Sequence, residues 1–159
     1  MRFSLALLAP LFAGFAASAV NVPRVISTNH GTLTAPTIGT LVASQQSFPF
    51  GYKASDWCQD GYSPITVWLL DYAPTTANLN ATGQFTDAAY YFGAFLIGNF
   101  GLPPIGPNPV PPPTLTAPDL SGYAAGSGLY LAVVETAKNC PPGNQPAQYG
   151  LTSTQLTTV

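Results

Sequence analysis

The feature that most constrains the fold is an apolar stretch in the middle of the chain, GYSPITVWLLDY at residues 61–72. It opens with turn residues and continues through a β-branched and aromatic run, residues 65–70, that contains neither glycine nor proline. Such a run is typical of a buried strand. Both pleat faces are largely apolar, so we expect the strand to lie centrally in a sheet, with one face on the core and the other at least partly covered.

The rest of the chain divides into further short β-type segments punctuated by glycine and proline, and no segment has a helical period with caps. The additional expected strands are residues 20–28, 31–36, 40–43, 46–52, 88–97, 128–137 and 150–159. In the segment 46–52, Phe48, Phe50 and Tyr52 share one face and are predicted to belong to the core, while Pro49 indicates an edge or bulged strand. Seven or so short strands predict an all-β, immunoglobulin-like or fibronectin-III-like β-sandwich.

Residues 103–118 contain eight prolines in sixteen positions. Proline fixes φ and lacks a backbone donor, so this stretch is predicted to be extended, polyproline-like chain without a helix or a central strand. We interpret it as a stiff crossover between sheets. The alternative is a docking segment for an aromatic groove.

Residues 1–19 are predicted to be a secretory signal peptide, with one arginine, an apolar run and small residues before a cleavage site after Ala19. A membrane anchor is the weaker interpretation because Pro10 and Gly14 interrupt the run. Residues 20–159 would then form a single secreted domain of about 140 residues, enough to bury a core. We expect a protein without a membrane span, located outside the cell.

Only 6% of the residues are charged, and after the leader three basic side chains, Arg24, Lys53 and Lys138, face six acidic ones. Phosphate binding needs a basic patch, so nucleic acid is excluded as a partner. Solubility must then depend on uncharged polar side chains and on sugar. The sequence Asn80-Ala81-Thr82 is an N-glycosylation sequon in a polar stretch.

Two cysteines, Cys58 and Cys140, remain in a chain bound for an oxidising compartment, and we predict that they form a disulfide. A metal site would need more cysteines and histidines, and His30 is the sole histidine. A thiol nucleophile would likewise need a histidine within reach. We therefore expect no metal and no cofactor.

Catalytic patterns in the sequence are weak. The stretch GYSPI around Ser63 lacks the second glycine of a nucleophile elbow, and His30 would have to serve as its base. Asp71 and Glu135, each near the end of an expected strand, are the best available carboxylate pair for a glycosidase. The simpler interpretation makes them solvated charges at strand ends, so we predict no catalytic residues.

Binding is better supported than catalysis because several aromatic residues lie in sequence typical of loops. Their rings could present a flat face to a sugar, although aromatics also pack beneath the loops of a sandwich that has few charges. The candidates for carbohydrate contact are Trp57, Tyr62, Tyr123 and Tyr149.

The succession SFPFGY, ITVWLLDY, YYFGAFLIGNF, a proline-rich stretch, LTAPDLSG and GLYLAVVET resembles a group of small secreted proteins of mushroom-forming fungi. More distantly, through strand order and the stretch PTIGTLVASQQSFPFGY, the chain is similar to the immunoglobulin-like N-terminal domain of fungal cell-wall β-glucan synthesis proteins, the killer-toxin-resistance family. That family supplies no catalytic residues. The resemblance implies a non-enzymatic protein of the fungal cell wall or extracellular matrix that binds β-glucan.

Two further hypotheses stand beside this one. The first is a structural or interaction protein that self-associates through an apolar sheet face or edge. The second, the least favoured, is an enzyme that acts on polysaccharide.

Overall fold

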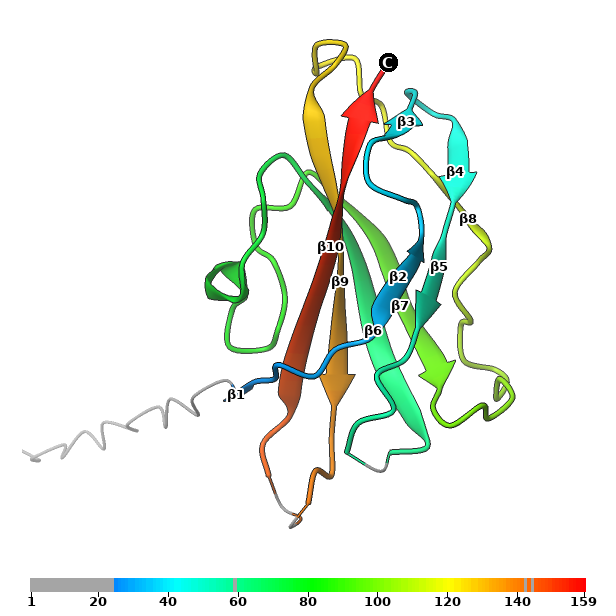
Figure 1. Cartoon of the computed structure of the whole chain (residues 1–159), viewed down its shortest axis with the longest axis vertical. Helices are drawn as coiled ribbons and strands as arrows, with labels where there is room; N and C mark the ends of the chain where they lie inside the picture. Colours follow the sequence, from blue (N-terminus) through cyan, green and yellow to red (C-terminus); the bar gives the residue numbers. More distant parts are fainter. Residues whose placement is uncertain (1–24, 59, 142, 144) are drawn as a thin grey trace, which may run out of the picture.

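The computed structural model describes residues 25–58, 60–141, 143 and 145–159. In this part of the chain there are ten strands, one 3₁₀ turn (η1, Thr76–Asn78) and no α-helix (Figure 1). The strands are β1 (Val25–Ile26), β2 (Thr32–Ala35), β3 (Thr40–Val42), β4 (Ser47–Pro49), β5 (Gly51–Lys53), β6 (Tyr62–Leu70), β7 (Tyr90–Gly98), β8 (Thr114–Thr116), β9 (Gly128–Ala137) and β10 (Gln148–Thr158). The all-β prediction is confirmed. The described residues include no helix of the length and hydropathy that crossing a membrane requires.

Six strands form the main sheet, in the order β1-β10-β9-β6-β7, with β3 also paired to β10. The long strands β6, β7, β9 and β10 pair antiparallel with one another, whereas β1 and β3 run parallel to β10. Strand β6 has a neighbour on each side, so the prediction of a central strand is confirmed. The sheet is therefore built around the segment that dominates the sequence.

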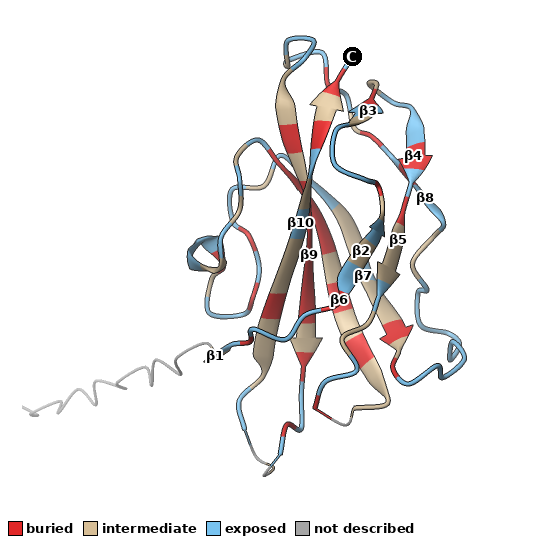
Figure 2. Ribbon diagram, in the orientation of Figure 1, coloured by how far each residue is buried: buried red, intermediate tan, exposed pale blue. Residues whose placement is uncertain are grey.

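One face of the main sheet packs against two small sheets, β2 with β5 and β4 with β8. Ile65, Val67 and Leu69 of β6 contribute to this core and are almost fully buried. Figure 2 shows the resulting band of buried residues along β6 and β9. Phe48 and Phe50 close the core from the opposite layer, as expected from their spacing. Each such side chain contributes about 1.5 to 3 kcal/mol to stability through burial.

A loop instead of a layer of strands covers the opposite face of the sheet. Trp68 and Leu70 of β6 lie there beneath Leu79 and Phe85 of the loop 71–89, and the rings of Trp68 and Phe85 meet edge to face at 6.0 Å. This explains why β6 is apolar on both pleat faces. The hydroxyl of Tyr72 donates a 2.7 Å hydrogen bond to Asp87 near the end of the loop, and burial together with this bond raises the pKa of Tyr72 to about 12.

Pro64 lies inside the central strand without breaking its pairing. It stands opposite Leu96 of β7, and the N–H of Leu96 points away from β6 to the carbonyl of Pro109. On the other side of β6, pairing with β9 begins one residue later, at Ile65. The missing proline donor therefore removes no ladder bond, which is the condition under which a sheet tolerates proline.

The proline-rich stretch runs from β7 in the main sheet to β8 in the opposite layer, so it is a crossover. Two backbone hydrogen bonds attach it before β8 begins: the N–H of Leu96 donates to Pro109, and the N–H of Phe50 donates to Pro113. The same chain shields the outer edge of β7, where a register shift next to Gly93 (φ 137°) adds a bulge. Bulges and proline are common protections for an edge strand.

Ten strands are present where seven or so were expected, for two local reasons. The segment 46–52 changes partner at Phe50, so it forms β4 against β8 and β5 against β2. Residues 114–116, expected to be polyproline-like, form the short strand β8 because four consecutive non-proline residues follow Pro113. The predicted signal peptide and the first residues of the expected strand 20–28 lie outside the described residues.

Candidate ligand-binding site

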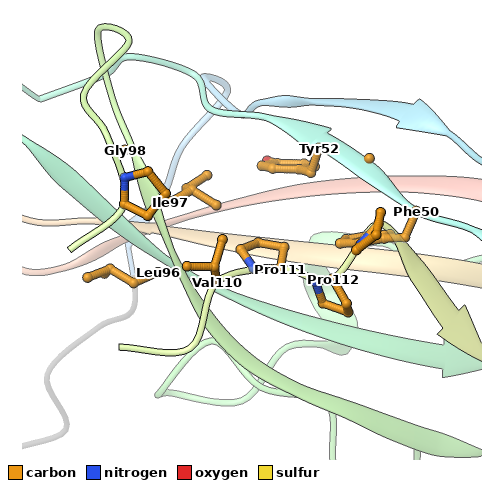
Figure 3. Close-up of a pocket in the computed structure, with 11 residues that line it drawn as sticks. Phe50, Tyr52, Leu96, Ile97, Gly98, Val110, Pro111 and Pro112 are labelled. Atoms are coloured by element: carbon orange, nitrogen blue, oxygen red, sulfur yellow. The ribbon is translucent and has the colours of Figure 1, made fainter. Parts of the chain in front are cut away.

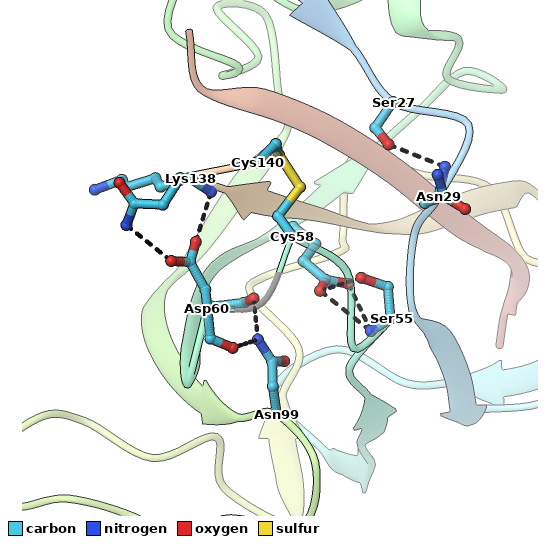
Figure 4. The surroundings of a disulfide bond; sticks show 11 residues. Ser27, Asn29, Ser55, Cys58, Asp60, Asn99, Lys138 and Cys140 are labelled. Atoms are coloured by element: carbon cyan, nitrogen blue, oxygen red, sulfur yellow. Dashed lines mark hydrogen bonds between the residues drawn. A yellow bond between two sulfur atoms is a disulfide. The ribbon is translucent and has the colours of Figure 1, made fainter. Parts of the chain in front are cut away.

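Cys58 and Cys140 form a disulfide, which confirms the prediction from the sequence. Both half-cystines are buried at one end of the molecule. The bond joins the loop between β5 and β6 to the loop between β9 and β10, as Figure 4 shows. Two loops distant in sequence are thereby fixed to each other.

A carboxylate reinforces this cross-link. Asp60 accepts hydrogen bonds from the backbone N–H of Lys138 (2.7 Å) and from the side-chain amide of Asn139 (2.9 Å). The Asp60 carbonyl accepts a third bond from the amide of Asn99 (2.7 Å), which also donates to Ser63 Oγ (2.9 Å). Asp60 therefore connects three loops at this end of the molecule (Figure 4).

A pocket of about 330 Å³ lies on these loops. The residues that line it are Asp56, Trp57, Cys58, Phe100 and Pro141. Trp57 is 40% exposed and Phe100 is 59% exposed, so both rings are accessible to a ligand. The N–H of Phe100 donates a 2.7 Å bond to one Asp56 carboxylate oxygen, which ties the two sides of the pocket together. The other oxygen, Oδ2, accepts no hydrogen bond from a described residue.

Three of the five described residues that line the pocket have left-handed backbone: Asp56 (φ 55°), Cys58 (φ 66°) and Phe100 (φ 55°). This conformation costs about 1 to 2 kcal/mol for an ordinary residue, and it is unusual for a bulky one such as Phe100. Strain of this kind persists only where the surroundings impose it, and it gathers at functional sites. Here the disulfide and the Asp56 bond hold the strained backbone in place, so the two rings are preorganised.

The pocket combines aromatic surface with a few polar groups, which is the usual composition of a small-molecule or sugar site. The indole N–H of Trp57 is a donor that no other described residue uses, and Asp56 Oδ2 is a free acceptor. A donor, an acceptor and exposed rings are the kinds of group that the hydroxyls and the apolar face of a pyranose can contact.

The structure places the four aromatics predicted for carbohydrate contact in different surroundings. Trp57 lines the pocket. Tyr62 is half-buried and donates a 2.8 Å bond to the Pro103 carbonyl, so it supports the start of the crossover beyond Phe100. Tyr123 packs against the main core, and Tyr149 packs in the cluster on the opposite face of the sheet. The four rings thus do not form one surface.

The sequence patterns did not identify Phe100 as a candidate for ligand contact. The residue stands in the turn GNFG between glycines at positions 98 and 101. An aromatic residue flanked so closely by glycines seldom enters a strand core, and that signal could have identified it as an exposed ring.

Glu135 is 2% exposed and accepts hydrogen bonds from four donors. Its partners are the Gly31 N–H (2.8 Å), the Tyr52 hydroxyl (2.8 Å), the Ser55 hydroxyl (2.7 Å) and the Ser55 N–H (3.2 Å). Burial raises the pKa of Tyr52, and the adjacent carboxylate raises it further. Glu135 is therefore a buried link that joins β9 to Tyr52 of β5 and to the loop residues Gly31 and Ser55. The interpretation as a solvated strand-end charge is wrong.

Asp71 and Glu135 do not form a carboxylate pair. Asp71 follows the last residue of β6, and Leu70 pairs with Tyr130, so the two carboxylates are separated by six residues along β9. At about 3.3 Å per residue this is roughly 20 Å. Glycosidase pairs lie within about 5 to 10 Å.

Ser63 and His30 bond to separate partners. Ser63 is buried and accepts from Asn99, whereas His30 is exposed and its Nδ1 lies 2.8 Å from Thr152 Oγ1. Asn80 of the sequon lies in the loop 71–89, and its side-chain oxygen accepts bonds from Thr82 and Gln84. Glycosylation at Asn80 stays a prediction.

A second hollow, of about 370 Å³, separates β5 from β7 beneath the crossover, and Figure 3 shows its lining side chains. Phe50, Leu96 and Ile97 form one part of its wall, and Val110 with the prolines at 111–113 forms another. None of the described residues that line it is charged. Polar anchors of the kind found beside Trp57 are missing here, since the hydroxyl of Tyr52 is engaged by Glu135.

A scan against protein-family models finds no match for this chain, and no curated protein sequence matches it. The described residues contain no group of three His, Cys, Asp or Glu side chains that could hold a metal ion. The geometry of the pocket beside the disulfide therefore carries the case for a function.

Proposed function

We propose that this chain is a secreted, non-enzymatic protein of the fungal cell wall or extracellular matrix that binds β-glucan in the pocket between Trp57 and Phe100. The observation that carries the proposal is the strained left-handed backbone of Cys58 and Phe100 at the pocket. A chain gains nothing in stability from left-handed backbone under an exposed phenyl ring. Its retention is explained if the ring has to be presented to a ligand.

The chemistry of the site favours an uncharged polysaccharide. Two exposed rings offer stacking surface, and the Asp56 carboxylate offers an acceptor for hydroxyl groups. The carboxylate of Asp56 lines the pocket itself, so it would repel an acidic polymer there. The hydroxyl groups of a glucan can donate hydrogen bonds to the Asp56 carboxylate, and a glucan carries no charge.

The fold and location are part of this proposal. Two packed β-layers, a disulfide and a last strand that pairs with segments near the start of the described chain support an immunoglobulin-like sandwich. The disulfide supports an oxidising, extracellular environment.

The first test is retention on insoluble β-glucan, with chitin as a comparison. Trp57→Ala is expected to reduce the bound fraction so that the apparent Kd rises about tenfold or more, as for loss of a central aromatic contact. Tyr90→Ala is the matched control, because Tyr90 is 43% exposed and lies at the far end of β7 from Gly98. Absence of retention for the unmodified protein on both polymers, or an equal loss in the two variants, would refute sugar binding at this pocket.

The second test separates a binding role of Phe100 from a structural one. Phe100→Gly removes an exposed ring and relieves a φ of 55°. Relief of the left-handed strain stabilises the folded state by about 1 to 2 kcal/mol. The greater backbone entropy of glycine in the unfolded chain partly offsets this gain, so the free energy of unfolding should stay equal or rise by up to about 1 kcal/mol. Glucan retention should nevertheless fall about tenfold. A variant that loses stability and keeps retention would show that the ring serves the fold.

A further inference from the structure

The outer edge of β10 is open in its middle. Its first two residues, Gln148 and Tyr149, pair with β1, and its residues 156–158 pair with β3. Residues 150–155 between these contacts have no strand of the described chain on that side. Figure 1 shows the reason: the chain leaves β1, crosses the sheet to β2, and returns to β10 only at β3.

The hydrogen-bond pattern identifies which backbone groups face this gap. The carbonyls of Tyr149 and Gln155 point outward, since they accept bonds from the N–H groups of Ser27 (2.9 Å) and Gly39 (2.8 Å). Alternate residues of a strand point the same way, so Leu151 and Ser153 also direct their N–H and C=O groups outward. No hydrogen bond from another described residue reaches these four groups.

Side chains hold the gap open. A continued parallel ladder would bring the N–H of Asn29 to β10, but that N–H donates instead to Ser27 Oγ (3.0 Å). The chain then turns onto the inner face of the sheet. There Thr152 Oγ1 donates to the Gly31 carbonyl (2.8 Å), and Glu135 accepts the Gly31 N–H.

We propose that this gap binds an extended, uncharged peptide segment of about five residues from another polypeptide by strand addition. The span from Tyr149 to Gln155 is six residues, roughly 20 Å, which sets the length of the segment. Main-chain bonds to Leu151 and Ser153 would supply the pairing, as in other cases of strand addition.

The surroundings of the gap specify an uncharged partner. Neither the segment 25–43 nor the segment 147–159 contains a charged residue. Exposed aliphatic side chains flank both ends: Ile26 on β1, Ile38 (78% exposed) just before β3 and Leu41 (64% exposed) on β3. A segment with β-branched or aliphatic side chains would cover these groups.

A second folded copy does not fit. Pairing of β10 with the same strand of another molecule would need space along all eleven residues, and β1 and β3 already occupy both ends. A flexible terminus or linker is free of this restriction. The gap therefore selects a short unpaired segment over a strand that is already part of a sheet.

The test uses the capped peptide acetyl-Thr-Val-Thr-Val-Thr-amide as the probe, followed by amide NMR of the whole protein. Titration should shift the Leu151 and Ser153 amide signals and slow their hydrogen exchange. A peptide with the same side chains and N-methylated alternate amides should have no effect. Ser153→Pro removes an outward N–H, so the apparent Kd should rise about tenfold or more, whereas Ser153→Ala should bind normally.

The proposal is overturned if the peptide leaves both amides unchanged, if it shifts signals only elsewhere, or if the N-methylated peptide binds equally well. The same amides shifting with protein concentration alone would identify self-association and would also overturn it. If Ser153→Pro does not fold, the comparison of the two peptides decides. Glucan retention by Trp57→Ala is independent of these outcomes.

Discussion

Replacing Glu135 by alanine is expected to lower the free energy of unfolding by about 4 kcal/mol. The carboxylate is 2% exposed and satisfies donors from Gly31, Tyr52 and Ser55. Its removal leaves these donors buried without an acceptor, and each such loss costs about 1 to 3 kcal/mol. Urea denaturation followed by tryptophan fluorescence measures the change.

Partial variants calibrate this prediction. Tyr52→Phe removes one donor and leaves the carboxylate in place, so it should cost about 1 to 2 kcal/mol. Asp71→Ala is the matched control, because Asp71 is an exposed carboxylate at the other end of the sheet, and it should change stability by less than about 0.5 kcal/mol. Equal effects of Glu135→Ala and Asp71→Ala would contradict the role of Glu135 as a buried link.

Loss of the disulfide should have an effect of similar size. Replacing Cys58 and Cys140 together by alanine opens a loop closed across 82 residues. The chain-entropy model gives about 4.5 kcal/mol for a loop of this length. Alanine is preferred to serine because both sites are buried and offer no partner to a hydroxyl. Urea or thermal unfolding of the double variant measures the loss.

The same variant tests whether the cross-link organises the pocket. Cys58 lines the pocket, and Pro141 lines it beside Cys140, so release of the two loops should reduce glucan retention under conditions where the sheet remains folded. Wild-type protein treated with a reductant provides the comparison without mutation. If the reduced protein is retained on glucan as strongly as the oxidised protein, then Asp60 and its hydrogen bonds alone hold the loops.

Patterns local to the sequence predicted the framework of the fold. An apolar run with two apolar faces indicated a central strand, and it is β6. Aromatics at spacing two indicated core positions, and Phe48 and Phe50 are buried. Two cysteines in a chain with a leader-like start indicated a disulfide, which joins Cys58 and Cys140. In each case neighbouring residues carry the information.

Features that depend on distant contacts could not be read in this way. The environment of Glu135 is built from residues about 80 and 104 positions away, so nothing near it in the sequence distinguishes it from an exposed charge. Phe100 is exposed because its turn is fixed by Asp56 from another loop. The parallel pairing of β1 and β3 with β10, and hence the gap between them, also arises only when the ends of the chain meet.

The proline crossover and the bulge at Gly93 limit how large an assembly this sheet can build. A filament grows by strand pairing only if each subunit offers one receptive edge and one donating edge. On the β7 side the crossover occupies Leu96, and on the β10 side the opening is too short for a strand already in a sheet. We therefore expect that strand pairing does not continue from one molecule to the next. This favours dispersed protein although only 6% of the residues are charged.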